Sequence, residues 1–300
     1  FGITNNTKPL IYQPGDRGNY DNINFIVLAL VIEKVSGITY SNYITQYILR
    51  PAGMTHTFFL PSPYTQPINF PFAWPDLFPH KYSDTIVKAK EVPYIVNYWS
   101  AYKFSGFGDY VSTTHDLLNY DKAYYNGKLL RSETIDKAFL PVKLNIGKNN
   151  PGNFGWGWEI YKDSSLGKVI YHNGNATGLS CILVRNISKH QTIIVFDNIH
   201  VNNSEGLAFT ILKMLNGIEM PLPKKSIAAE YARTLLKEGA KAAREKLTVL
   251  RADTIHYQLS EDEMNDIGYD FMGGPNNPNP YRFPEEHKYQ EALEILKLNT

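Results

Sequence analysis

The segment Tyr171-His172-Asn173-Gly174-Asn175-Ala176-Thr177-Gly178 is a polar, glycine-containing interruption between two apolar runs. The flanking runs, residues 169–171 and 179–184, are rich in β-branched and aromatic residues, so we expect both to be β-strands. A histidine and two glycines then lie at a strand end, where Gly174 would let a ligand carbonyl approach the backbone. On this segment alone, an ordinary hairpin turn rich in Asn and Gly is the alternative.

The composition indicates one large globular domain, or one domain with an appendage. The chain has 300 residues, 43% of them hydrophobic, with 30 Lys+Arg against 29 Asp+Glu. A net charge of +1 gives no electrostatic reason to expect nucleic acid or an anionic membrane as the main partner. No apolar run approaches the ~20 residues of a membrane-spanning helix. The single cysteine, Cys181, is expected in a buried strand and cannot form an internal disulfide.

Two helices are predicted near the N-terminus. Residues 25–35 form an apolar run with helical spacing, and Gly37 supplies a stop signal, so we expect a buried helix there. A second helix is expected over about 40–49, ended by the following Arg-Pro pair. Tyr20 and Asn22 then stand just before the first helix, where Asn22 has helix capping as an alternative role.

The middle of the chain has a less regular pattern. Residues 58–100 are rich in proline and aromatic residues without clear periodicity. Such a stretch forms either a functional lid or cleft wall, or a surface excursion pinned by prolines, and we keep both interpretations. Helices are expected over about 115–125, capped by the preceding Ser-Thr-Thr, and over 132–139.

Strands return in the following part of the chain. The pattern predicts strands over 154–161, 169–173, 179–186 and 191–198, and their short connections make them antiparallel neighbours. A helix over about 204–215 carries an apolar stripe and should pack on this sheet. The sequence therefore predicts an α+β fold, an antiparallel sheet flanked by helices.

A proline-rich joint near residue 220 separates this part from a helical C-terminal region. We expect a domain over residues 1–218 and an all-helical appendage over 219–300. The last two predicted helices, 261–272 and 284–298, loosely resemble the helix pair of a tetratricopeptide repeat. One such repeat cannot form a superhelix alone, so a packing appendage is the expected role. Two further helices are predicted over about 226–236 and 240–251.

Two short motifs, read together, resemble a known family. Tyr20-Asp21-Asn22 before a helix, and His172-Asn173-Gly174 on a strand, resemble the second and third motifs of the penicillin-recognising serine hydrolases. These β-lactamase-related proteins include class C β-lactamases, D-Ala-D-Ala carboxypeptidases and esterase relatives. Further stretches match the family in order and spacing, over roughly residues 10–216: residues 32–37, 48–54, 111–117 and 155–158.

The resemblance implies roles for the residues of the two motifs. Tyr20 would accept and return the proton of a catalytic serine, which requires nearby positive charge because the ordinary pKa of tyrosine is about 10. His172 would help by its charge or by a relay hydrogen bond. Asn22 would orient a lysine or hold a substrate amide, since its side chain has both a donor and an acceptor.

The third motif is expected to contact the substrate. Gly174 would permit close approach, and the backbone N–H of Asn175 would be one donor to the oxyanion. Asn173 stands where the family commonly has Thr or Ser, which makes its part in recognising a substrate carboxylate an open question.

The family's first motif, Ser-x-x-Lys, is expected upstream of Tyr20, and no such pattern precedes it here. One match, Ser165-Leu166-Gly167-Lys168, follows the wrong motif and is rejected as catalytic. We therefore expect the chain to be the C-terminal part of a hydrolase that lacks its nucleophile and is inactive by itself.

The resemblance implies an acyl-enzyme mechanism on a β-lactam, a D-Ala-terminated peptide or a small ester, in the periplasm or in an exported protein. The alternative is a non-catalytic protein on the same fold that binds a peptide or a partner. The histidines lack metal-ligand spacing, and Gly106-Phe107-Gly108 is not a phosphate loop, so neither a metal nor a cofactor is expected. The oligomeric state does not follow from the sequence.

Overall fold

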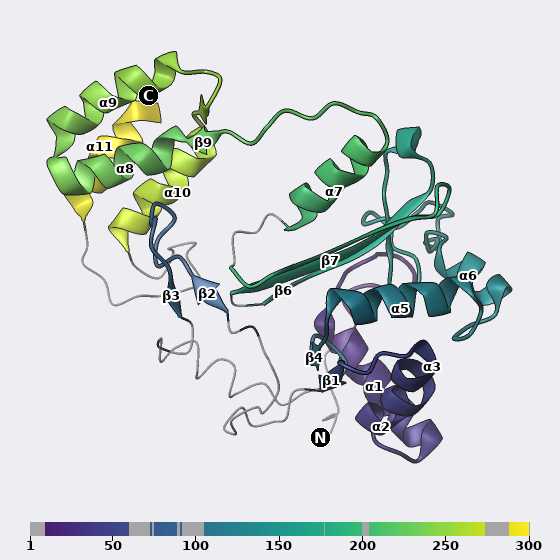
Figure 1. Cartoon of the computed structure of the whole chain (residues 1–300). Coiled ribbons are helices and arrows are strands. Elements are labelled where there is room, and N and C mark those ends of the chain that lie inside the picture. Colours follow the sequence, from purple (N-terminus) through teal and green to yellow (C-terminus); the bar gives the residue numbers. More distant parts are fainter. Residues whose placement is uncertain are drawn as a thin grey trace.

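Figure 1 shows the computed structural model of the chain, which describes residues 10–59, 73, 75–88, 91, 105–176, 178–199, 204–273 and 288–299. The predicted α+β architecture is confirmed: an antiparallel sheet lies between helices, and several helices form the C-terminal part. Most of the proline- and aromatic-rich stretch lies outside the described residues, so its two interpretations stay predictions.

The first helix, α1 (Asn22–Ser36), begins and ends with the expected signals. Asp21 caps it, because its side chain accepts a hydrogen bond from the Ile23 N–H, and Gly37 ends it in the left-handed conformation, with φ 74°. The prediction that this helix is buried is wrong. Of its residues only Ala29 is buried, and several large apolar side chains are exposed, because no element that the structure describes covers that face.

The second helical segment runs further than predicted. It consists of α2 (Tyr40–Ile44), a wider π-helical turn η1 (Thr45–Leu49) and α3 (Arg50–Ala52). Pro51 does not end it, since the π-helical turn changes the hydrogen-bonding pattern before a residue that has no N–H to donate. The segment ends at Gly53, which has φ 73°.

The central sheet has the order β5-β6-β7-β8, with each neighbour antiparallel. Its strands are β5 (Glu159–Ile160), β6 (Val169–Ala176), β7 (Leu179–Asn186) and β8 (Gln191–Asp197). The polar motif is not an interruption after the strand: β6 continues through it to Ala176. In this register His172 pairs with Leu183, and Gly174 pairs with Cys181.

The strand predicted over 154–161 is reduced to the two residues of β5. Side chains take the place of a strand neighbour here: the Phe154 N–H donates to Asn150 Oδ1, and Asn150 Nδ2 donates to the Phe154 carbonyl. Asn153 has φ 54°, which no regular strand contains. Asparagine tolerates this conformation and satisfies backbone groups locally, so it competes with sheet formation.

The two faces of the sheet carry different helices. Helix α7 (Ser204–Leu215) packs on one face, as predicted. Helices α5 (Thr114–Tyr125) and α6 (Ser132–Ala138) cover part of the other face (Figure 1). The alternation of side chains along a strand assigns Ile170, His172 and Gly174 to the α5 face, and Tyr171 and Asn173 to the α7 face.

The C-terminal region is a bundle of two helix pairs. Helices α8 (Ile227–Glu238) and α9 (Ala240–Ala252) form one pair, and α10 (Glu261–Met272) and α11 (Tyr289–Leu296) form the other, followed by the 3₁₀ turn η4 (Lys297–Asn299). Gly268 lets the second pair approach, because a Cβ there would lie 2.7 Å from Leu296 Cδ2. The expected boundary near residue 218 stays a prediction.

Three pairs of short strands complete the described fold. Strands β1 (Phe58–Phe59) and β4 (Tyr110–Val111) pair with each other, as do β2 (Asp76–Leu77) and β3 (Val87–Lys88). Strands β9 (Lys225–Ser226) and β10 (Tyr257–Gln258) form a parallel pair beside the bundle. Within the described ranges no single helix is long and apolar enough to cross a bilayer. The helical segments 22–36 and 40–52 are long and apolar enough only when taken together, and they are bent by 80° relative to each other.

Candidate active site

The structure brings the two sequence motifs together. The rings of Tyr20, just before α1, and His172, on β6, lie 6.1 Å apart between centroids. Phe154 stacks on Tyr20 with a centroid distance of 5.7 Å, and Phe25 contacts the same ring at 5.7 Å. More than a hundred residues separate the motifs in sequence, so their meeting is a property of the fold.

Two asparagines contact the segment that leads to Tyr20, and sequence reasoning missed both. Asn145 donates from its side chain to the Pro14 carbonyl at 3.0 Å, and its N–H donates to the Gly15 carbonyl at 2.8 Å. A Cβ on Gly18 would lie only 2.9 Å from Asn150 Cβ, so glycine permits the close approach there. The only signal in the sequence was the density of Asn and Gly in residues 145–153.

The surroundings of Tyr20 favour its neutral form. The side chain is half-exposed, and partial burial raises its pKa, with the negative charge of Glu159 raising the pKa further. Glu159 also accepts a hydrogen bond from the Tyr171 hydroxyl at 3.0 Å. The expected positive charge that would lower the pKa of Tyr20 is not among these causes.

His172 is oriented by its own backbone. Its Nδ1 lies 2.7 Å from the carbonyl oxygen of Asn173. A carbonyl oxygen can only accept, so Nδ1 carries the proton in this contact, and Nε2 is the acceptor nitrogen of the neutral ring. A ring in this tautomer can accept a proton through Nε2 or relay one from Tyr20.

Gly174 and Cys181 lie side by side on the α5 face. A Cβ on Gly174 would lie 3.1 Å from the Cys181 sulfur, closer than side chains normally pack. Cys181 lies in a strand that is largely buried, as expected, but Cys181 itself is exposed. The described helices cover this face of the sheet only near the other end of β6. Desolvation by its neighbours still raises the pKa of its thiol.

The other two residues of the third motif lie apart from this group. The Asn173 side chain points to the α7 face, where its Nδ2 donates to Glu205 Oε2 at 2.7 Å. Asn175 is exposed near the end of β6 and pairs with Ser180. Their roles toward a substrate carboxylate and an oxyanion stay predictions.

Asn22 is exposed in the first turn of α1, one residue after the cap. The alternative role weighed for it, helix capping, belongs to Asp21 instead. A role for Asn22 in orienting a lysine or a substrate amide therefore stays a prediction.

The rejected Ser-x-x-Lys pattern lies at the other end of β6. Ser165 is in the 3₁₀ turn η3 (Ser164–Leu166), and the Lys168 ammonium lies 5.9 Å above the Phe139 ring. Lys168 precedes His172 by four positions, which corresponds to about 13 Å at a rise of ~3.3 Å per residue. Among the described residues there is also no group of three or more His, Cys, Asp or Glu that could hold a metal ion.

Comparison with known proteins identifies the family. The sequence model of the β-lactamase family matches residues 6–212, which include both motifs and the whole central sheet. The chain belongs to the β-lactamase family. Members of this family are serine hydrolases.

The most informative curated relatives are bacterial. The chain is 29% identical over 198 residues to penicillin-binding protein 4* of Bacillus subtilis, a match that covers 62% of this chain and 41% of that protein. It is 25% identical over 197 residues to protein flp of Staphylococcus aureus, covering 64% of this chain and 35% of that protein. The chain thus spans less than half the length of these relatives.

Solved structures show the same fold. The octameric penicillin-binding protein homologue from Pyrococcus abyssi has a TM-score of 0.57 at 24% identity and covers 76% of this chain and 48% of that one. The penicillin-binding protein from Bacillus halodurans has a TM-score of 0.52 at 20% identity and covers 70% and 59%. At these identities the likeness concerns the fold alone.

Proposed function

We propose that this chain is part of a serine hydrolase that forms an acyl-enzyme on a β-lactam, a D-Ala-terminated peptide or a small ester. The observation that carries the proposal is the approach of Tyr20 to His172, two family motifs that meet beside Gly174 on the α5 face. The nucleophile is proposed to come from a Ser-x-x-Lys segment outside this chain, and the whole protein to be periplasmic or exported.

In the proposed mechanism each group has one task. The serine attacks the substrate carbonyl and its proton passes to the Tyr20 oxygen, while Nε2 of His172 can take up the hydroxyl proton of Tyr20. Backbone N–H groups, that of Asn175 among them, stabilise the oxyanion, while Gly174 leaves space for the substrate. This step requires a positive charge near Tyr20 that offsets the effect of Glu159 on its pKa. The lysine of the proposed Ser-x-x-Lys segment has such a charge.

A binding protein without catalysis is the second candidate. It is favoured by the raised pKa of Tyr20 and by the Asn173 side chain, which is held by Glu205 on the opposite face. Such a protein would bind a peptide on the α5 face of the sheet, where Tyr20 and His172 meet.

The full-length encoded protein, incubated with a fluorescent penicillin and analysed by mass spectrometry, tests the proposal. We expect one adduct, on a serine of a Ser-x-x-Lys motif upstream of Tyr20. Tyr20→Phe should slow acylation by about 10²-fold or more, the usual contribution of a general base. Tyr269→Phe, at an exposed tyrosine of α10, is the matched control and should acylate at the normal rate.

Each other outcome has a definite meaning. An adduct on Ser165 would overturn the assignment of the nucleophile. A full-length protein with no Ser-x-x-Lys motif upstream of Tyr20 and no adduct would replace the hydrolase by the binding protein. Equal acylation rates for Tyr20→Phe and Tyr269→Phe would remove Tyr20 from the mechanism.

A further inference from the structure

A hairpin of residues 75–88 contacts both the C-terminal bundle and the turn between β6 and β7 (Figure 1). Its strands β2 and β3 are antiparallel, and a turn closed by the Ser83 N–H and the His80 carbonyl, 3.0 Å apart, joins them. It belongs to the proline- and aromatic-rich stretch, for which the sequence indicated a cleft wall or a surface excursion.

One end of the hairpin is attached to the sheet. The Asp76 N–H donates to the Asn198 carbonyl at 2.7 Å, just after β8. Gly178, in the β6–β7 turn, has φ +76°, and a Cβ there would lie 2.4 Å from Pro75 Cβ and 2.9 Å from Leu77 Cδ2. Leu77 is fully buried. Gly178 therefore packs against the hairpin at a distance that leaves no space for a side chain. It lies four residues after Gly174 in the sequence.

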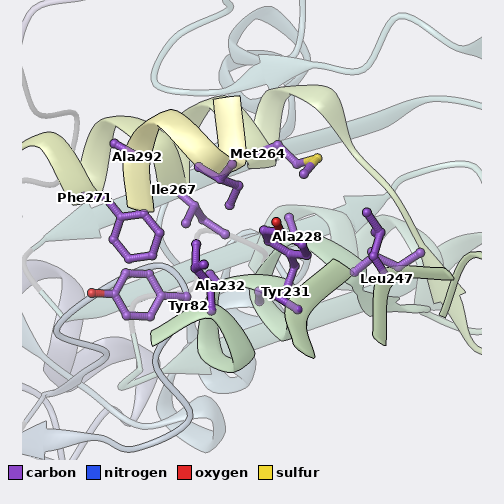
Figure 2. Packing of buried hydrophobic residues seen from close by; sticks show 14 of the residues in the cluster. Tyr82, Ala228, Tyr231, Ala232, Leu247, Met264, Ile267, Phe271 and Ala292 are labelled. Carbon is purple, nitrogen blue, oxygen red and sulfur yellow. The ribbon is translucent and has the colours of Figure 1, made fainter. Parts of the chain in front are cut away.

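The other end of the hairpin is inserted into the bundle. Tyr82 is buried in the hydrophobic cluster formed by α8, α9, α10 and α11, and its ring lies 4.8 Å from that of Phe271 (Figure 2). Burial and the Asp270 carboxylate raise the pKa of Tyr82, so its ring stays neutral in this apolar site. Arg233, on α8, donates to the Tyr82 carbonyl at 2.8 Å.

Polar contacts fix the tip of the hairpin in the same place. The Lys81 N–H donates to Asp270 Oδ2 at 3.1 Å, and the Lys81 ammonium pairs with Asp266 on α10. The His80 ring stacks on Tyr82 at 4.9 Å with an interplanar angle of 2°. Because Asp270 is buried, its hydrogen bond with the Lys81 N–H is shielded from water and fixes the hairpin backbone to α10.

We propose that the C-terminal bundle positions the β6–β7 turn, and with it the end of β6 that carries Gly174, through Tyr82 and the 75–88 hairpin. Tyr82 is a positioning residue that acts at a distance, because among the described residues its contacts are with the bundle and the hairpin. The bundle is then a structural support of the candidate site and not only an appendage. This coupling is a property of the fold, and only its consequence for substrate rests on the proposed function.

Hydrogen exchange of the whole chain, followed by mass spectrometry, tests the coupling. In Tyr82→Ala we expect the amides of residues 178–181 to exchange about tenfold faster than in the unmodified protein, because the support of the turn is lost. Tyr82→Phe keeps the ring and should exchange at the original rate. Leu247→Ala, in the same cluster but on α9, should raise exchange in α8 and α9 and leave the turn unchanged.

A milder variant covers the case in which Tyr82→Ala does not fold. Asp270→Ala removes the acceptor of the Lys81 N–H and leaves the Tyr82 ring in place, and we expect a smaller increase in exchange at the same amides. The coupling is wrong if residues 178–181 exchange normally in both variants, or if Leu247→Ala accelerates them as much as Tyr82→Ala does.

The consequence for function has a separate test. In a full-length protein that is acylated by penicillin, Tyr82→Ala should raise KM more than it lowers kcat, since the substrate-facing strand end is displaced and the reacting groups are kept. Failure of acylation in the unmodified protein would concern the proposed function alone and would leave the exchange result standing.

Discussion

Tyr20 lies where a proton acceptor is needed, yet both causes that shift its pKa raise it. Of these, burial is the larger cause, and Glu159 is the one that a single substitution can remove. Glu159→Gln should therefore lower the pKa of Tyr20 toward the ordinary value of about 10 without reaching it. The pKa can be followed by NMR on protein with labelled tyrosine rings, with the Tyr20 signal assigned from Tyr20→Phe.

The matched control for this titration is Glu205→Gln, which removes the carboxylate beside Asn173, a group that is not among the causes that shift the pKa of Tyr20. It should leave the pKa of Tyr20 unchanged. Equal shifts in the two variants would show that Tyr20 senses the overall charge of the protein and not its neighbour Glu159.

At the scale of elements, the β6–β7 turn depends on a glycine for two separate reasons. Gly178 and Gly217 have almost the same φ, +76° and +77°, but only Gly178 has neighbours within 4 Å of an added Cβ. Gly217→Ala should cost about 1–2 kcal/mol of unfolding free energy, the penalty of the left-handed conformation. Gly178→Ala should cost at least ~1 kcal/mol more, because its methyl group overlaps the hairpin.

Urea denaturation of both variants gives the difference directly. Equal losses of unfolding free energy would mean that the hairpin moves away from the turn without cost, and would also weaken the inferred support of the β6–β7 turn.

The packing of α5 against β7 depends on a buried ion pair. Arg185 is fully buried and pairs with Asp121 of α5, which also accepts from Thr192 at 2.8 Å. The guanidinium lies 4.6 Å from the Tyr125 ring centroid. Asp121→Ala should cost about 3–5 kcal/mol, because it leaves a buried positive charge unpaired.

Glu294→Gln is the control for this ion pair, since it breaks the partly exposed pair with Arg244 and should cost at most ~1 kcal/mol. Thermal or urea unfolding of both variants measures the two losses. Similar losses would mean that the rings around Arg185 stabilise its charge without the carboxylate.

Sequence patterns predicted most elements whose signals are local. The bounds of β7, α7 and α10 agree with the expected ranges, because each has an apolar pattern bounded by turn formers or a cap. The strand predicted from residue 154 failed because Asn150 bonds its backbone, a tertiary effect without periodicity. In the site, the family resemblance implied that Tyr20 and His172 lie close together. The Asn173–Glu205 bond depends on which face of β6 each residue occupies, which the motif does not show.

At the scale of the whole molecule, the surface over α1 is the clearest departure from expectation. Its apolar run was expected to be buried, but Val27, Val31 and Val35 recur every four residues on one face and are all exposed. Val35 is 82% exposed. A sequence pattern shows that a helix has an apolar face, but not which other part of the protein covers that face.

This face should make the chain bind the hydrophobic dye ANS in its folded state, because contiguous exposed apolar surface of this kind is unusual on a globular protein. The double variant Val31→Lys, Val35→Lys should bind much less dye and keep its unfolding free energy within about 0.5 kcal/mol, since exposed positions contribute little to stability. Ile255→Lys, at a residue that is 77% exposed in the turn before β10, is the control and should leave dye binding unchanged. Undiminished fluorescence in the double variant would mean that the exposed face of α1 is not where the dye binds.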